Sequence, residues 1–150
     1  MSSISDLTTH TGYWMRMVSN AVSQDFARKV AAEDVTVAEW AFMRALYDEK
    51  AMAPSALAEK MGMTKGAISK LAERLLAKGL IGRADSDRDK RAHSLFLTPE
   101  GRAKVPRLAS LADLNDADYF GVLTSEEHAA LDRILRALVE RRGLNGVPVD

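Results

Sequence analysis

A short helix and a second, capped helix, separated by a tight turn and followed at once by a charged hairpin, restrict the fold of this chain most. Pro54 suits the first turn of a helix, and Gly62 permits the left-handed turn that ends it. Thr64 can then cap a second helix. Two β-rich runs follow over 80–84 and 93–97, separated by the polar stretch DSDRDKR. The sequence therefore predicts a helix-turn-helix that carries a β-hairpin wing.

Two helices are predicted before this segment. Ser5 or Asp6 can cap a first helix that extends to about Ala32, along which apolar residues recur at helical spacing. Thr36, with Glu39 three residues later, forms a capping box that begins the second. The chain is therefore helical up to the predicted helix-turn-helix.

Two more helices are predicted after the hairpin. Thr98 caps the first, which continues to roughly Asp118, and Thr124 begins the second, which ends at Gly143. Residues 144–150 are expected to be a loose tail. The expected fold is mainly α with a small β-hairpin wing, a winged helix-turn-helix flanked by N- and C-terminal helices.

The charge of the chain is concentrated in one segment. Its formal net charge is zero, yet residues 60–91 contain nine Lys or Arg and four Asp or Glu, a local excess of five positive charges. A protein that contacts DNA on one face needs a basic patch there rather than a basic whole. Exposed basic residues are often merely solvated, so it is their coincidence with the predicted helix-turn-helix and wing that favours DNA.

The helix that follows Thr64 has an apolar face and an opposite face that is small, polar and basic. A helix that enters the major groove, which is about 12 Å wide, needs such a face. Its N-terminus also favours a phosphate, and arginines at the hairpin tip suit a narrow minor groove. We expect DNA contacts from Ser55, Thr64, Lys65, Gly66, Ser69, Lys70, Arg74, Arg88, Lys90 and Arg91, with Asp87 and Asp89 orienting the cations of the tip.

The order and spacing of several short runs resemble the MarR family of transcription factors. These runs are PSALAE at 54–59, MTKGAIS at 63–69, DRDKR at 87–91 and LTPEG at 97–101. The flanking helices match the family plan as well, so the resemblance covers nearly the whole chain. It implies that Lys65, Ser69 and Lys70 lie on the recognition helix, that Arg91 enters the minor groove and that Asp87 steadies the wing. Ala53 departs from the pattern, because the family often has a capping residue there.

The terminal helices offer apolar residues for a partner. Leu7, Trp14 and Val18 lie near one end of the chain, and Leu131, Ile134 and Leu138 near the other. The resemblance implies a homodimer that packs these helices together and binds a pseudo-palindromic operator of double-stranded DNA. We therefore expect an N-terminal dimerisation helix over 1–35, a winged helix-turn-helix DNA-binding lobe over 36–99, and C-terminal dimerisation helices with a tail over 100–150.

The resemblance also implies repression that a small aromatic or phenolic anion relieves by binding between the dimer region and the DNA-binding lobe. The aromatic and methionine side chains concerned are also typical of core packing, and Arg44 is equally suited to an ion pair with Asp48. The residues expected to line the effector site are His10, Tyr13, Trp14, Met17, Trp40, Met43 and Arg44.

Several other classes of function are disfavoured. The chain has no cysteine, which excludes disulfides and thiolate metal sites and suits the cytoplasm. We find no signal peptide, no membrane span and no histidine spacing for a metal, and we expect no cofactor. Asp85, Asp87 and Asp89 resemble the start of a calcium loop, but Lys90 and Phe96 stand where it needs glycine and glutamate. No catalytic constellation is evident, so an enzyme is not expected. The alternative is a winged-helix module that binds protein.

Overall fold

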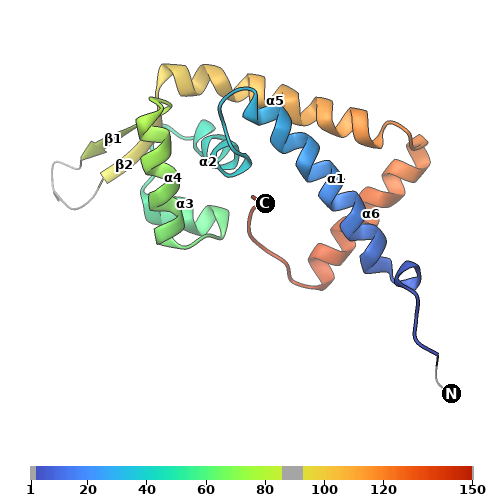
Figure 1. Ribbon diagram of the computed structural model, residues 1–150. Coiled ribbons are helices and arrows are strands. Elements are labelled where there is room, and N and C mark those ends of the chain that lie inside the picture. Colours follow the sequence, from blue (N-terminus) through green and yellow to red (C-terminus); the bar gives the residue numbers. More distant parts are fainter. Residues whose placement is uncertain (1–2, 86–92, 150) are drawn as a thin grey trace.

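The computed structural model describes residues 3–85 and 93–149, and within these ranges it is mainly helical with one two-stranded sheet, as predicted (Figure 1). α5 runs along the upper edge in Figure 1 and joins the winged lobe to the end of the molecule that holds α1 and α6. The elements are a 3₁₀ helix at Leu7–Thr9, α1 (Thr11–Ala31), α2 (Val37–Tyr47), α3 (Pro54–Met61), α4 (Lys65–Ala77), β1 (Ile81–Asp85), β2 (His93–Leu97), α5 (Pro99–Phe120) and α6 (Ser125–Arg141).

Threonine caps begin four of the helices, and the sequence identified all of them. The hydroxyl of Thr64 accepts the amide N–H of Ala67 at 3.1 Å, and Thr98 caps α5 in the same way. Thr36 and Thr124 form complete capping boxes with the glutamates three residues later. Because each cap joins residues only three apart, these helix starts are fixed by local sequence.

The start of the first helix differs from the prediction, because neither Ser5 nor Asp6 caps α1. Residues Leu7–Thr9 form a separate 3₁₀ turn, and α1 begins after His10, whose side chain makes no cap hydrogen bond. The Thr9 hydroxyl donates to the carbonyl oxygen of Asp6 at 2.7 Å. This side chain-to-backbone bond, together with the Thr9 N–H that also donates to the Asp6 carbonyl, stabilises a local turn in place of the helix.

The two strands form an antiparallel hairpin in which Ile81 pairs with Leu97 and Asp85 pairs with His93. β1 begins one residue later than predicted. The amide of Leu80 donates to the carbonyl of Leu75 at 3.0 Å, so Leu80 still belongs to the turn that ends α4. Gly79, with φ of 72°, makes this left-handed turn possible.

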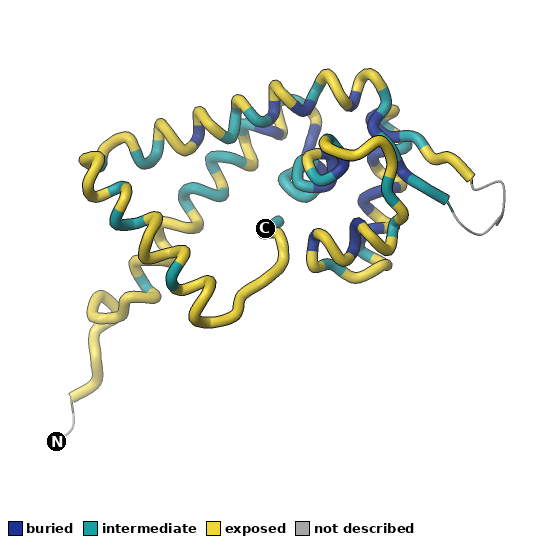
Figure 2. Tube along the Cα trace, turned by 180° about the vertical axis from the view of Figure 1, so that it is seen from behind, coloured by how far each residue is buried: buried dark blue, intermediate teal, exposed yellow. Residues whose placement is uncertain are grey.

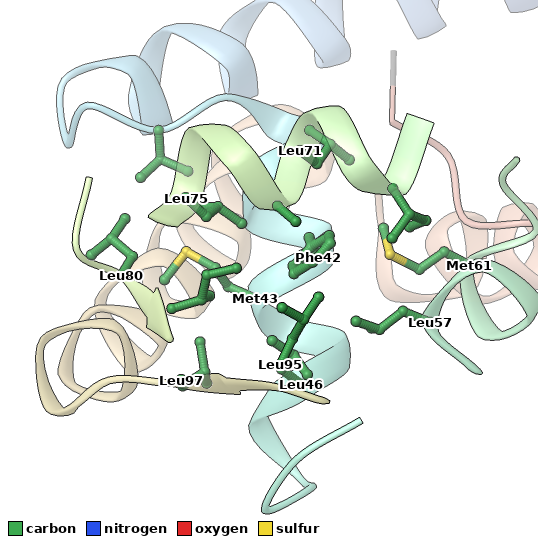
Figure 3. Close-up of a cluster of buried hydrophobic side chains, with 14 of the residues drawn as sticks. Phe42, Met43, Leu46, Leu57, Met61, Leu71, Leu75, Leu80, Leu95 and Leu97 are labelled. Carbon is green, nitrogen blue, oxygen red and sulfur yellow. The ribbon is translucent and has the colours of Figure 1, made fainter. Parts of the chain in front are cut away.

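The hydrophobic core lies in the winged lobe. Figure 3 shows Phe42 and Met43 of α2 among the buried leucines of α4 and β2, which include Leu71, Leu75 and Leu95. Figure 2 shows the contrast with the opposite end of the molecule, which is mostly exposed. Among the described residues, α1 buries only Val30, and α6 buries none. The two terminal helices therefore leave apolar surface without cover in a single chain.

Polar contacts fix α5 against α1 and the loop that follows it. Asn115 of α5 is buried. Its Oδ1 accepts a hydrogen bond from the Lys29 ammonium at 3.0 Å, and its Nδ2 donates to the carbonyl of Val22 at 3.3 Å. The carboxylate of Glu33 accepts a hydrogen bond from Arg107 at 2.7 Å. The backbone carbonyl of Glu33 accepts one from the Lys104 ammonium, also at 2.7 Å. These bonds join α5 to the segment that leads into the winged lobe.

The C-terminal tail is ordered against the rest of the chain, which differs from the loose tail expected. The amide of Val147 donates to the carbonyl of Met61 at 3.0 Å, and Val149 packs against the hydrophobic core. The sequence could not show this contact, because it joins residues more than half the chain apart.

Candidate nucleic-acid interface

The outer face of α4 is fully open to solvent. Ile68, Leu71 and Leu75 are buried beneath it, so the helix is held in the lobe by one side only. A Cβ added at Gly66 would meet no described atom within 4 Å, which leaves the backbone there accessible to a large ligand. The predicted DNA-contact residues on this helix are all exposed, namely Lys65, Gly66, Ser69, Lys70 and Arg74, with the capping Thr64 before them.

The preceding helix and turn fix the direction of α4. Gly62 ends α3 with φ of 64°, and the amide of Met63 donates to the carbonyl of Ala58 at 2.9 Å. Ser55, in the first turn of α3, is exposed as predicted. Ala53 stands at the N-cap and makes no side-chain cap bond, so the departure noted in the sequence is a real loss of one cap.

The far end of α4 is attached to the start of α2 by an ion pair that the sequence did not reveal. The Lys78 ammonium lies 3.1 Å from Oε1 of Glu39 and donates to the carbonyl of Asp34 at 2.7 Å. Glu39 is completely buried. The sequence identified Glu39 as part of a capping box. Nothing in the neighbouring sequence indicated that Glu39 is buried or that it pairs with Lys78.

Burial and these hydrogen-bond partners determine the ionisation of Glu39. Burial raises the pKa of the Glu39 carboxyl, but hydrogen bonds from the Thr36 backbone N–H and the Lys78 ammonium outweigh it, and the net pKa is lowered. Within the described part of the chain, Oε2 of Glu39 has no hydrogen-bond partner. A charged, half-satisfied carboxylate therefore lies beneath the helix that presents the basic face.

Arg88, Lys90 and Arg91, with the supporting Asp87 and Asp89, lie outside the described residues. Their contact with DNA stays a prediction.

A cleft of about 690 Å³ lies between the winged lobe and the helices that leave it. Trp40 and Arg44 of α2 line it, as predicted for an effector site, and Arg44 forms an ion pair with Asp48 at 2.9 Å. Sequence reasoning missed the remainder of the lining, because it comes from four other parts of the chain. These residues include Phe26 of α1, Lys60 of α3, Asn115 of α5, and Val147 and Pro148 of the tail.

The other predicted effector residues lie elsewhere. His10, Tyr13 and Met17 line a separate hollow of about 570 Å³ at the start of α1. Trp14 packs edge-on against Tyr13, with ring centroids 5.1 Å apart, and donates its indole N–H to the backbone. Met43 is completely buried in the core, so it cannot line a cleft. The seven residues therefore do not form one site.

Within residues 3–85 and 93–149, no helix is long and apolar enough to cross a membrane. No group of three or more His, Asp or Glu side chains in those ranges lies close enough together to hold a metal ion.

Comparison with known proteins finds similarity to one family of transcriptional regulators. The model of the MarR family matches residues 33–92, the segment from the loop after α1 to the residue before β2. The chain is 29% identical to a putative transcriptional regulatory protein for the hcr operon of Thauera aromatica, over 85% of this chain and 77% of that protein. It is 28% identical to the transcriptional regulator HosA of Escherichia coli, over 71% of this chain and 78% of that protein. By these comparisons the chain is similar to the MarR family over residues 33–92 and to transcriptional regulators over most of its length.

Solved structures of MarR-type proteins share the fold along nearly the whole chain. PcaV of Streptomyces coelicolor, solved with its natural ligand, has a TM-score of 0.75 and 24% identity, covering 93% of this chain and 98% of that one. A mutant MarR of E. coli in complex with operator DNA has a TM-score of 0.74 and 22% identity, covering 85% of this chain and 92% of that one. Members of the MarR family are transcriptional regulators rather than enzymes.

Proposed function

We propose that this protein is a sequence-specific regulator that binds double-stranded DNA as a homodimer, with α4 in the major groove. The observation that carries this proposal is the exposed face of α4, on which Lys65, Ser69, Lys70 and Arg74 are open to solvent and the backbone at Gly66 is accessible. Lysine and arginine bind phosphates and guanine edges, and the free N–H groups at the start of α4 bind phosphate. The wing residues Arg88, Lys90 and Arg91 extend the contact into the minor groove.

The homodimer is supported by the apolar surface that one chain leaves open. Leu7 is 73% exposed, Trp14 is 51% exposed and Ile134 is 52% exposed. Large apolar side chains left exposed on both terminal helices are typical of an interface, and a two-fold dimer presents two copies of α4 about one helical turn of DNA apart. We therefore assign residues 1–35 and 100–150 to dimerisation and residues 36–99 to DNA binding, in the cytoplasm.

The proposed control is repression that a small aromatic or phenolic anion relieves from the cleft. The cleft offers the ring of Trp40, with the cations of Arg44 and Lys60 at its wall. One structural neighbour, BpsR of Bordetella bronchiseptica, was solved to explain how 6-hydroxynicotinic acid regulates its DNA binding, and it has a TM-score of 0.76. MdtR of Bacillus subtilis, 26% identical to this chain, is a repressor.

The experiment is selection of duplexes from a random library by the purified protein, followed by sequencing. Enrichment of a pseudo-palindrome with half-sites near one helical turn apart is the expected result. Absence of enrichment, with and without aromatic acids, would favour the protein-binding alternative.

The effector is tested on the enriched duplex with 6-hydroxynicotinic acid and related aromatic acids. The acid that binds the cleft weakens DNA affinity, and Arg44→Met abolishes that response while leaving affinity for DNA unchanged. Arg16→Met is the matched control, because Arg16 lines the other hollow. A response that survives Arg44→Met, or one that Arg16→Met abolishes, would place the effector elsewhere.

A further inference from the structure

The C-terminal tail crosses from the end of α6 to the turn of the helix-turn-helix. Figures 1 and 2 show this segment leaving α6 and returning between the terminal helices and the winged lobe. The amide of Leu144 still donates to Val139 at 2.9 Å, so the tail separates from the helix only after that residue. Three residues later, the amide of Val147 donates to the carbonyl of Met61 at 3.0 Å. The tail is thus attached to the turn that directly precedes α4 in the chain.

Two glycines make this approach possible. A Cβ added at Gly62 would lie 2.6 Å from the Cα of Gly146, which is closer than real side chains come to a backbone atom. Gly62 and Gly146 both have positive φ, 64° and 91°. Only glycine meets both demands at Gly62 without displacing the tail. The turn that directs α4 is therefore also the seat of the tail.

The tail also forms one wall of the cleft. Val147 and Pro148 face the same space as Trp40, Arg44 and Lys60, and Val149 packs at the edge of the core beyond them. These tail residues are apolar, as is the part of the cleft around Trp40. A flat aromatic ligand that packs on Trp40 therefore meets the tail.

We propose that the tail, residues 145–149, is a built-in strap that closes the effector cleft and competes with the aromatic anion for it. This proposal rests on the effector cleft assigned under Proposed function. When the strap is seated, it holds the turn at Met61 and Gly62. When a ligand displaces it, that turn loses its contact with α6, and α4 is freed relative to the dimer helices.

The seating of the strap is tested without DNA or effector. The chain has two tryptophans, so Trp14→Phe leaves Trp40 as the only one. In that background, deletion of residues 145–150 is expected to raise the acrylamide quenching constant of Trp40 about twofold or more, because a covered wall becomes exposed. Circular dichroism at the same protein concentration verifies that the shortened chain is folded. An unchanged quenching constant would overturn the strap.

A glycine pair gives the matched control for the full-length chain. Gly62→Ala pushes the tail away, so the quenching constant should rise nearly as far as in the deletion. Gly79→Ala imposes the same left-handed penalty, φ being 72°, but a Cβ there meets nothing nearer than 3.8 Å and is far from the tail. It should leave quenching unchanged. Equal effects of the two substitutions would contradict the seat at Gly62.

Competition is tested by titrating 6-hydroxynicotinate and the fluorescent aromatic anion 8-anilinonaphthalene-1-sulfonate. Deletion of residues 145–150 should tighten the apparent affinity of one or both anions about threefold or more. The reason is that the full-length chain binds an anion only in the fraction of molecules in which the tail has left the cleft. Increased quenching with unchanged affinity would overturn the competition but keep the strap as a cover. If neither anion binds either chain, the competition and the effector role of the cleft fall together, while the quenching result still decides whether the strap is seated.

Discussion

Replacing Lys78 with methionine removes the cation that faces the buried carboxylate of Glu39. The Glu39 side chain is 1% exposed and that of Lys78 is 29% exposed, so only one partner of the pair can turn to water. In the variant, the Thr36 backbone N–H at 2.9 Å remains as the donor to Oε1. Loss of one partner of a buried pair costs about 3–5 kcal/mol, and we expect the low end or less, about 2–3 kcal/mol, since Lys78 is partly solvated.

The assay is urea unfolding at pH 7, compared at one protein concentration because unfolding is coupled to dimerisation. The matched control is Glu39→Gln combined with Lys78→Met, which removes both charges and keeps an amide that can complete the capping box. Since no uncompensated charge is left inside, the double variant should recover most of the loss and fall within about 1 kcal/mol of wild type.

The pH dependence follows from the lowered pKa of Glu39 in the folded chain, against its usual 4.5. A carboxyl with a lowered pKa stabilises the fold above its unfolded pKa, and that contribution is lost as the pH falls through the folded pKa. Lys78→Met raises the pKa of the Glu39 carboxyl in the folded chain. Protonation of that carboxyl at low pH therefore removes the buried charge that destabilises the variant. Its deficit is therefore largest at pH 7 and shrinks near pH 4. A deficit below about 0.5 kcal/mol, or one that is constant with pH, would refute this reasoning.

Three further predictions concern packing, capping and the dimer. Ile68→Ala empties a fully buried position in the core, and urea unfolding should show a loss of about 2–5 kcal/mol. Thr64→Ala removes the cap of α4 and should cost about 1 kcal/mol in the same assay, whereas a loss near zero would contradict the cap. Leu138→Glu places a charge on the apolar face of α6 and should convert the dimer to monomer in sedimentation equilibrium. Arg136→Ala, on the same helix, should leave the dimer intact.

Local sequence predicted those features that join neighbouring residues. The caps at Thr36, Thr64, Thr98 and Thr124 each depend on a bond across three residues, and all four are present. The buried face of α4 followed from apolar residues at helical spacing. The start of α1 was wrong, because side chain-to-backbone bonds around Thr9 compete with the predicted cap.

Features that join distant parts of the chain could not be predicted. Glu39 carries no mark of its burial, and its partner Lys78 follows 39 residues later. Met43 falls at the spacing of a cleft residue, yet β2 and α4 enclose it in the core. The cleft itself combines four helices and the tail, so a single sequence identified Trp40 and Arg44 but not the walls opposite them.

The role of α4 is tested most directly by the salt dependence of affinity for the duplex that the wild-type protein enriches. Each phosphate contact contributes about 0.9 to the slope of log affinity against log salt, so Lys70→Ala in a dimer should make the slope shallower by about 1.8. Arg28→Ala is the control, because Arg28 is exposed on α1 and pairs with Asp25. A shallower slope for Lys70→Ala alone is the predicted result. An unchanged slope for Lys70→Ala, or an equal change for Arg28→Ala, would contradict DNA binding through α4.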